Sequence, residues 1–193
     1  MLIFIGMKKN SLATDLAYVA VFTALVIVMA FVSIPGTAGV PIVMQNAMLI
    51  LAGLILGGRR GLYVGLLFLF LGLALPVLAG GGTTLKALAG PTAGYIVGYI
   101  VSPAVAGLIA YRSPRSKGGM TVMLAIAAFV ALAIQYTLGS FGLMIRSGMS
   151  ATAAFTAQLT FIPLDSVKIV VAIIIALGVH AAFPDLMGRK ARA

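Results

Sequence analysis

The chain has 193 residues, of which 62% are hydrophobic and only 8% are charged, and its mean hydropathy is +1.20. Soluble domains are about 45–50% apolar and about 25% charged, so the charged side chains here are too few to cover a water-soluble surface. The composition therefore predicts an integral membrane protein. The net charge of +10 comes from short basic groups between apolar stretches. Because no long basic run is present, we expect no nucleic-acid partner.

Catalytic and metal-binding chemistry has little support in the residue content. The chain has no cysteine, which excludes disulfides, thiolate metal sites and cysteine nucleophiles. Its single histidine, His180, is interpreted as an interfacial residue, and a histidine-rich metal site is impossible. A serine hydrolase needs a serine beside a histidine, but Ser166 lies 14 positions before His180, about 21 Å along a helix. We expect no catalytic residue, no metal site and no cofactor.

Apolar stretches occupy most of the chain, and a helix needs about 20 apolar residues to cross the bilayer. We predict six transmembrane helices, at residues 13–34, 42–57, 61–78, 90–111, 119–142 and 163–183. The first stretch, which Pro35-Gly36 ends, is too long for the apolar core of a signal peptide, about 7–15 residues. The predicted fold is an all-α integral membrane protein in which residues 1–193 form a single membrane domain.

Lysine and arginine are distributed unevenly between the loops, and this distribution predicts the orientation in the membrane. With the N-terminus inside, ten of them lie on the cytoplasmic side: Lys8, Lys9, Arg59, Arg60, Arg112, Arg115, Lys117, Arg189, Lys190 and Arg192. Only Lys86 and Arg146 lie outside, and Lys168 lies within the sixth span. We therefore expect a plasma-membrane protein with both termini in the cytoplasm.

In this orientation, unusual polar and glycine residues collect at the outer ends of the helices. They are Gln45, Asn46, Gly80, Gly81, Gly82, Lys86, Tyr95, Gln135, Tyr136, Asp165 and Lys168. Asp165 and Lys168 share a helix face at spacing i, i+3, and ionisable groups in a bilayer are functional-site candidates. The alternative is structural: Asp165 stabilises a helix N-terminus and Lys168 snorkels to the interface.

Two further patterns each have two interpretations. The run Gly80-Gly81-Gly82 either lets a ligand approach the backbone and closes over it, or is a flexible connector. Alanines at helical spacing in the first stretch either pack within the protein or dock onto a partner helix. These are Ala13, Ala17, Ala20 and Ala24.

Four segments, which together cover almost the whole chain, resemble the BioY family. This family comprises the biotin-binding membrane subunits, or S components, of energy-coupling factor transporters. The segments are VPIVMQN (40–46) with LAGLILG (51–57), GGG (80–82) with LAGPTAGY (88–95), Tyr136 with Gly139, and FIPLDSVK (161–168). The chain departs from the usual family pattern at Thr83-Thr84, Thr160 and Leu164.

The resemblance implies the six-helix S-component fold and capture of external biotin. It implies that Asp165 and Lys168 contact the ureido ring, that Gly80–Gly82 covers the ligand and that Tyr95 lies close to the pocket. We expect Gln45, Asn46, Tyr136 and Lys86 to belong to the same site. The resemblance also implies that Ala20 and Ala24 dock onto a transmembrane coupling subunit, with ATP hydrolysis carried out by partner ATPase subunits.

The chemistry of biotin suits these residues. Asp165 can accept a hydrogen bond from a urea N–H, Lys168 can donate to the urea oxygen, and Lys86 or Arg146 can meet the carboxylate. We therefore expect a biotin-binding transporter subunit that is not itself an enzyme. The alternatives are an S component for another vitamin, an intramembrane enzyme that uses Ser140 and His180, or a purely structural membrane protein. Homo-oligomerisation is left open.

Overall fold

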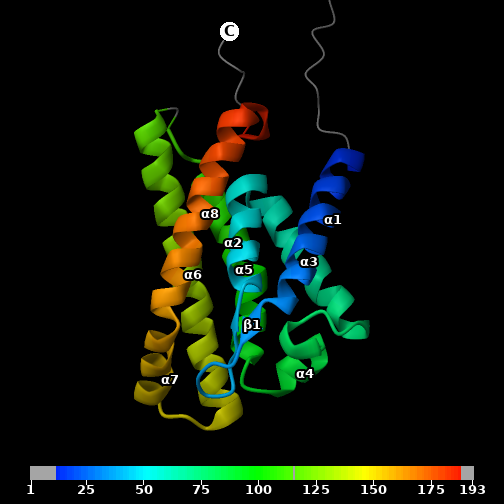
Figure 1. Ribbon diagram of the computed structural model, residues 1–193, viewed down its shortest axis with the longest axis vertical. Helices are drawn as coiled ribbons and strands as arrows, with labels where there is room; N and C mark the ends of the chain where they lie inside the picture. Colours follow the sequence, from blue (N-terminus) through cyan, green and yellow to red (C-terminus); the bar gives the residue numbers. More distant parts are fainter. Residues whose placement is uncertain (1–11, 115, 188–193) are drawn as a thin grey trace, which may run out of the picture.

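The computed structural model describes residues 12–114 and 116–187. Within these residues, six longer helices form a bundle (Figure 1). They are α1 (Leu12–Val28), α2 (Gln45–Leu56), α3 (Gly58–Ala74), α5 (Ala93–Ala110), α6 (Lys117–Ser147) and α8 (Ile162–Ala182). Shorter elements lie near one end of the bundle: β1 (Ser33–Ile34), β2 (Ile42–Val43), α4 (Thr84–Ala89) and α7 (Ala151–Ala157). The start of α1 and the end of α8 lie at the other end.

Four helical segments are long and apolar enough to cross a membrane on their own: Leu12–Phe31, Ala93–Ala110, Lys117–Ser147 and Ile162–Ala182. The helix α2 has 12 residues, about 18 Å. The helix α3 carries Arg59 and Arg60 in its first turn. The prediction of six spans is therefore matched by six helices in order, but four of them meet the length and hydropathy criterion. Six of the ten predicted cytoplasmic charges lie outside the described residues: Lys8, Lys9, Arg115, Arg189, Lys190 and Arg192.

The predicted boundary of the first helix is wrong at its C-terminal end. The segment predicted to be helical up to residue 34 leaves the helix after a 3-10 turn at Met29–Phe31. Ser33 and Ile34 then pair antiparallel with Val43 and Ile42. Apolar, β-branched residues suit a strand as well as a membrane helix, so hydropathy alone did not separate the two structures. Because of the same hairpin, the second helix begins at Gln45 rather than at the predicted residue 42.

The helix α2 is the centre of the bundle, since every residue in it except Met48 is buried. The carbonyl groups of its last turn lie inside the protein, where they need hydrogen-bond donors. Gly57 N donates to Gly53 O at 2.9 Å, and the Tyr111 hydroxyl donates to Ile55 O at 2.7 Å. The ring of His180 bonds Leu54 O through Nε2 at 2.9 Å. His180 is only 3% exposed, so its side chain is covered by protein, and its position at the membrane interface stays a prediction.

The helices α5 and α6 approach each other at backbone distance. A Cβ atom built on Gly94 would lie 1.8 Å from Leu138 O, and one on Gly142 would lie 2.4 Å from Gly94 N. Only glycine allows such an approach, which brings the first turn of α5 against α6. The next residue, Tyr95, is thereby positioned on the wall of a cavity at this end of the bundle.

Candidate binding site

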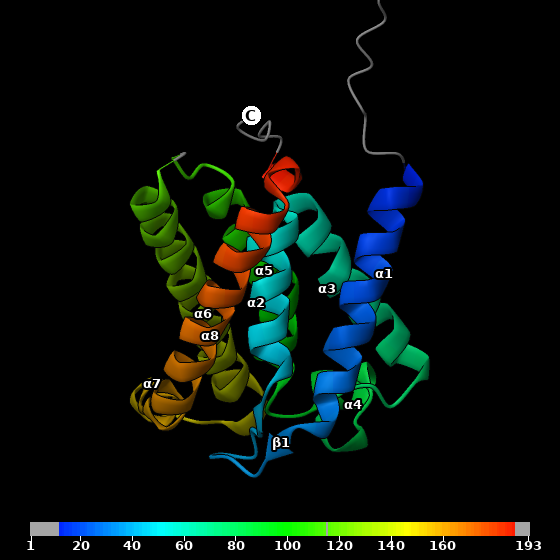
Figure 2. The ribbon, with the colours of Figure 1, turned by 45° about the horizontal axis from the view of Figure 1, so that its top comes forward.

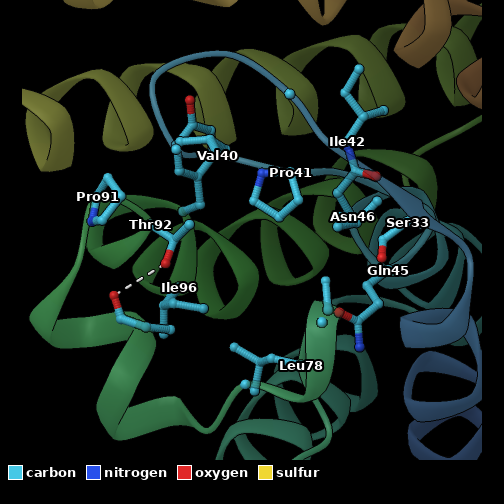
Figure 3. Close-up of a pocket in the computed structure, with 18 of the residues that line it drawn as sticks. Ser33, Val40, Pro41, Ile42, Gln45, Asn46, Leu78, Pro91, Thr92 and Ile96 are labelled. Carbon is cyan, nitrogen blue, oxygen red and sulfur yellow. Dashed lines mark hydrogen bonds between the residues drawn. The ribbon is translucent and has the colours of Figure 1, made fainter.

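A cavity of about 800 Å³ lies between the β1–β2 hairpin, the first turn of α2, the loop before α4 and the start of α5. Figure 3 shows Val40 and Pro41 of the hairpin facing a space that Leu78 and Ile96 border from other elements. The walls are mostly apolar, as in most small-molecule sites. Eight of the ten predicted site residues line the cavity: Gln45, Asn46, Gly80, Gly82, Lys86, Tyr95, Tyr136 and Asp165. Gly81 and Lys168 do not.

Among the described residues, Asp165 is the only carboxylate that lines this cavity, and it is 3% exposed. Its Oδ2 accepts hydrogen bonds from the Tyr136 hydroxyl at 2.8 Å and from Asn46 Nδ2 at 3.2 Å. Its Oδ1 forms an ion pair with Lys168. The carboxylate is thus held by groups from α2, α6 and α8. A buried charge of this kind is tolerated because it is paired and hydrogen-bonded.

Lys168 lies behind Asp165 rather than on the cavity wall. Its ammonium donates to Val43 O at 2.6 Å and to Asn46 Oδ1 at 3.1 Å, in addition to the ion pair with Asp165. A lysine ammonium has three N–H donors, and these three partners use all of them. The direct contact between Lys168 and a ligand therefore stays a prediction. In this arrangement Lys168 fixes β2, α2 and the carboxylate relative to one another.

Gln45 connects three parts of the chain around the cavity. Its Nε2 donates to Val26 O in α1 at 3.1 Å and to Val77 O in the loop before α4 at 2.9 Å. Both amide hydrogens are then used, so the side chain presents Oε1 as its free hydrogen-bonding function. Since Gln45 is 1% exposed, these bonds are made in the protein interior.

The glycine run forms a defined turn beside the cavity. Gly80 and Gly81 have φ values of 67° and 71°, which glycine adopts without a steric penalty. Leu78 and Gly82 close the turn through backbone bonds of 3.0 and 3.2 Å. Thr84 anchors the following helix, because its hydroxyl donates to Leu69 O at 2.8 Å. This turn places Gly80 and Gly82 on the cavity wall.

Tyr95 points its ring toward α6 and the 3-10 turn at Gln158–Thr160, which follows α7. Its hydroxyl donates to Gln158 Oε1 at 2.7 Å, and a Cβ atom on Gly139 would lie 2.3 Å from the tyrosine ring. Glycine at position 139 therefore makes the space that Tyr95 occupies.

Of the two candidate partners for a carboxylate, Lys86 is exposed and lines the cavity, whereas Arg146 is exposed but does not line it.

Several lining residues were not predicted. Tyr99 lies one helical turn after Tyr95 and shares its face of α5, so the i, i+4 spacing was a usable signal. The hairpin residues, from Ser33 to Val43, had been assigned to a helix or a connection. Ser140 and His180 make separate backbone contacts: the Ser140 hydroxyl donates to Ala154 O, and the His180 ring bonds Leu54 O.

The apolar helices and the cavity at one end of the bundle define an all-helical membrane protein with a site for a small molecule. A family model, that of the BioY family, matches residues 7–185. The chain therefore belongs to the BioY family, and the resemblance noted in the sequence is confirmed.

Individual proteins agree with this assignment. The chain is 34% identical over 183 residues to the biotin transporter BioY of Rhizobium etli, covering 91% of this chain and 97% of that protein. It is 36% identical over 173 residues to the biotin transporter BioY of Rhodobacter capsulatus, covering 84% and 90%. A solved structure, the S-component for biotin from an ECF-type ABC transporter, superposes with a TM-score of 0.80 at 27% identity, covering 91% of this chain and 95% of that one.

Proposed function

We propose that this chain is the biotin-binding S component of an energy-coupling factor transporter and captures external biotin. The observation that carries the proposal is a polar cluster, formed by the buried Asp165 and Asn46 and the half-buried Tyr136, in a mostly apolar cavity of about 800 Å³. Biotin combines an apolar bicyclic body with a urea group that has two N–H donors and one oxygen acceptor. The names and structure of the relatives point to the same ligand.

The free hydrogen-bonding capacity of the cluster matches the urea group. Asp165 and the Tyr136 oxygen each retain a lone pair that can accept a urea N–H. Asn46 uses one amide hydrogen on Asp165 and keeps the second for the urea oxygen. Lys168 supports this arrangement through its ion pair with Asp165. Tyr95, Gly80 and Gly82 border the apolar body, and Lys86 meets the carboxylate at the rim.

Binding of labelled biotin to the purified full-length chain tests the ligand. We expect tight binding that excess unlabelled biotin displaces and that excess riboflavin or thiamine does not. Displacement by one of the other two vitamins would assign the same scaffold to that vitamin instead. Ser140→Ala should bind biotin like the unmodified chain, because its hydroxyl lies away from the urea-binding cluster and contacts Ala154 O.

We propose that transport requires partner proteins. Six spans with both termini in the cytoplasm are supported by the start of α1 and the end of α8 lying at the same end of the bundle (Figure 1). The alanine row on α1, formed by Ala13, Ala17, Ala20 and Ala24, is exposed throughout. Small residues in an exposed row allow a second helix to approach closely. We therefore assign this row to the coupling subunit and ATP hydrolysis to partner ATPases.

Ala20→Trp and Ala24→Trp should abolish biotin uptake by cells while leaving biotin binding to the purified protein unchanged. A bulky side chain on this row prevents close helix approach, but the row is outside the binding cavity. The matched control is Val171→Trp, an exposed position on α8. If both alanine variants sustain normal uptake, the docking assignment is wrong even where biotin binding is intact.

A further inference from the structure

A second cavity, of about 660 Å³, runs between α1 and α3 and begins at their first turns. Figure 2 shows these two helices as neighbours at one edge of the bundle. Six apolar side chains line this α1–α3 groove: Leu12, Leu16, Val19, Leu66, Leu67 and Phe70. Three polar residues, Asp15, Arg59 and Tyr63, lie at the end where the helices begin.

The charges at this end of the groove do not cancel. Asp15 is paired with Arg60, whose Nε donates to its carboxylate at 3.0 Å. The guanidinium of Arg60 also lies 5.3 Å from the centroid of the Tyr18 ring. Arg59 is different, since it is exposed and makes one hydrogen bond, from Nε to the Tyr63 hydroxyl at 3.3 Å. The Arg59 guanidinium also lies 5.7 Å from the centroid of the Tyr63 ring. Within the described residues its two terminal nitrogens make no hydrogen bond or ion pair, and the two arginines with the one aspartate leave a net charge of +1 at this end.

The length of the groove matches one leaflet of a bilayer. Arg59 and Phe70 are eleven positions apart on α3, which is about 16 Å along the helix axis. Half of a hydrocarbon core about 30 Å thick is about 15 Å. A cation at the depth of the headgroups and an apolar surface along the acyl chains are thus arranged on the same pair of helices.

We propose that the α1–α3 groove binds an anionic phospholipid. Its phosphate lies at Arg59, whose terminal nitrogens form two parallel hydrogen bonds to phosphate oxygens, and the Tyr63 hydroxyl donates a third. One acyl chain lies against Leu66 and Phe70. Basic pockets between membrane helices recognise anionic headgroups in this way. An apolar partner helix fits less well, because it would bury the guanidinium of Arg59, which makes no ion pair within the described residues, against apolar side chains.

Lipid retention tests the proposal. The full-length chain is purified from bilayers of equal parts phosphatidylglycerol and phosphatidylcholine, and the lipids that remain bound are counted by native mass spectrometry. We expect about fivefold enrichment of phosphatidylglycerol, the effect of one basic residue near an anionic headgroup. Arg59→Gln should remove the enrichment, whereas Arg112→Gln, an exposed arginine outside the groove, should keep it.

A second variant separates the groove from the charge. Leu66→Trp should fill the apolar part and lower the retention of both lipids without changing the preference between them. The melting temperature of each variant shows whether it is folded. Equal retention of the two lipids by the unmodified chain would overturn the proposal, and so would an equal loss of enrichment in the Arg59 and Arg112 variants.

Discussion

Replacing Asp165 with alanine is expected to weaken biotin binding by about 10- to 100-fold, the effect of losing a hydrogen bond to a charged group. The same change should destabilise the protein by about 3–5 kcal/mol, because it leaves a buried lysine without its counterion. The Lys168 side chain is 10% exposed and would retain only neutral partners, Val43 O and Asn46 Oδ1. Thermal unfolding in detergent and labelled-biotin binding measure the two effects separately.

The double variant Asp165→Leu, Lys168→Met separates stability from recognition. Removing both members of a buried ion pair is often neutral or stabilising, whereas removing one is costly. We therefore expect the double variant to recover most of the melting temperature that Asp165→Ala loses, but not the binding of biotin. The control is Asp185→Asn, since Asp185 is exposed and outside the cavity. Normal melting and normal binding in Asp165→Ala would refute the role assigned to this carboxylate.

The sequence predicted the part of the site that depends on local spacing. Asp165 and Lys168 were expected to share a helix face at i, i+3, and the structure brings them into an ion pair. Their third partner, Asn46, lies 119 positions from Asp165 and could be grouped with it only by the side of the membrane. Lys168 uses all its donors within the protein because one of them binds Val43 O. The position of this backbone group follows from the fold, so the sequence alone did not predict the contact.

The fold was predictable where hydropathy distinguishes one structure from another. Six apolar stretches correspond in order to the six longer helices of the described residues. Hydropathy did not distinguish a helix from the strands at residues 33–34 and 42–43, because both place apolar residues in succession. It also did not reveal that α2 is surrounded by protein, since a buried helix and a lipid-facing helix have the same apolar composition.

Gly94→Ala is expected to cause one of the largest losses of stability of any single methyl addition in this chain. The new Cβ atom would lie 1.8 Å from Leu138 O and 2.8 Å from Gly142 N, both of which belong to the backbone of α6. No rotamer change can relieve a backbone contact, so α5 and α6 must separate. We expect a cost of at least about 3 kcal/mol, the upper part of the range for overpacking, and a lower melting temperature in detergent.

Biotin binding should weaken with Gly94→Ala because Tyr95 and Ile96, the next two residues of α5, line the cavity. The matched control is the same methyl addition at Gly178 in α8, where nothing beyond the adjoining backbone of its own helix lies within 4 Å of the new Cβ. There alanine should stabilise the helix by about 0.5–1 kcal/mol, since glycine is costly in a helix interior. If the same methyl addition lowers the melting temperature at position 94 and raises it at position 178, the α5–α6 contact, rather than helix propensity, makes glycine necessary at position 94. An unchanged melting temperature in Gly94→Ala would contradict this prediction, because it would mean that the backbones of α5 and α6 leave room for the added methyl group.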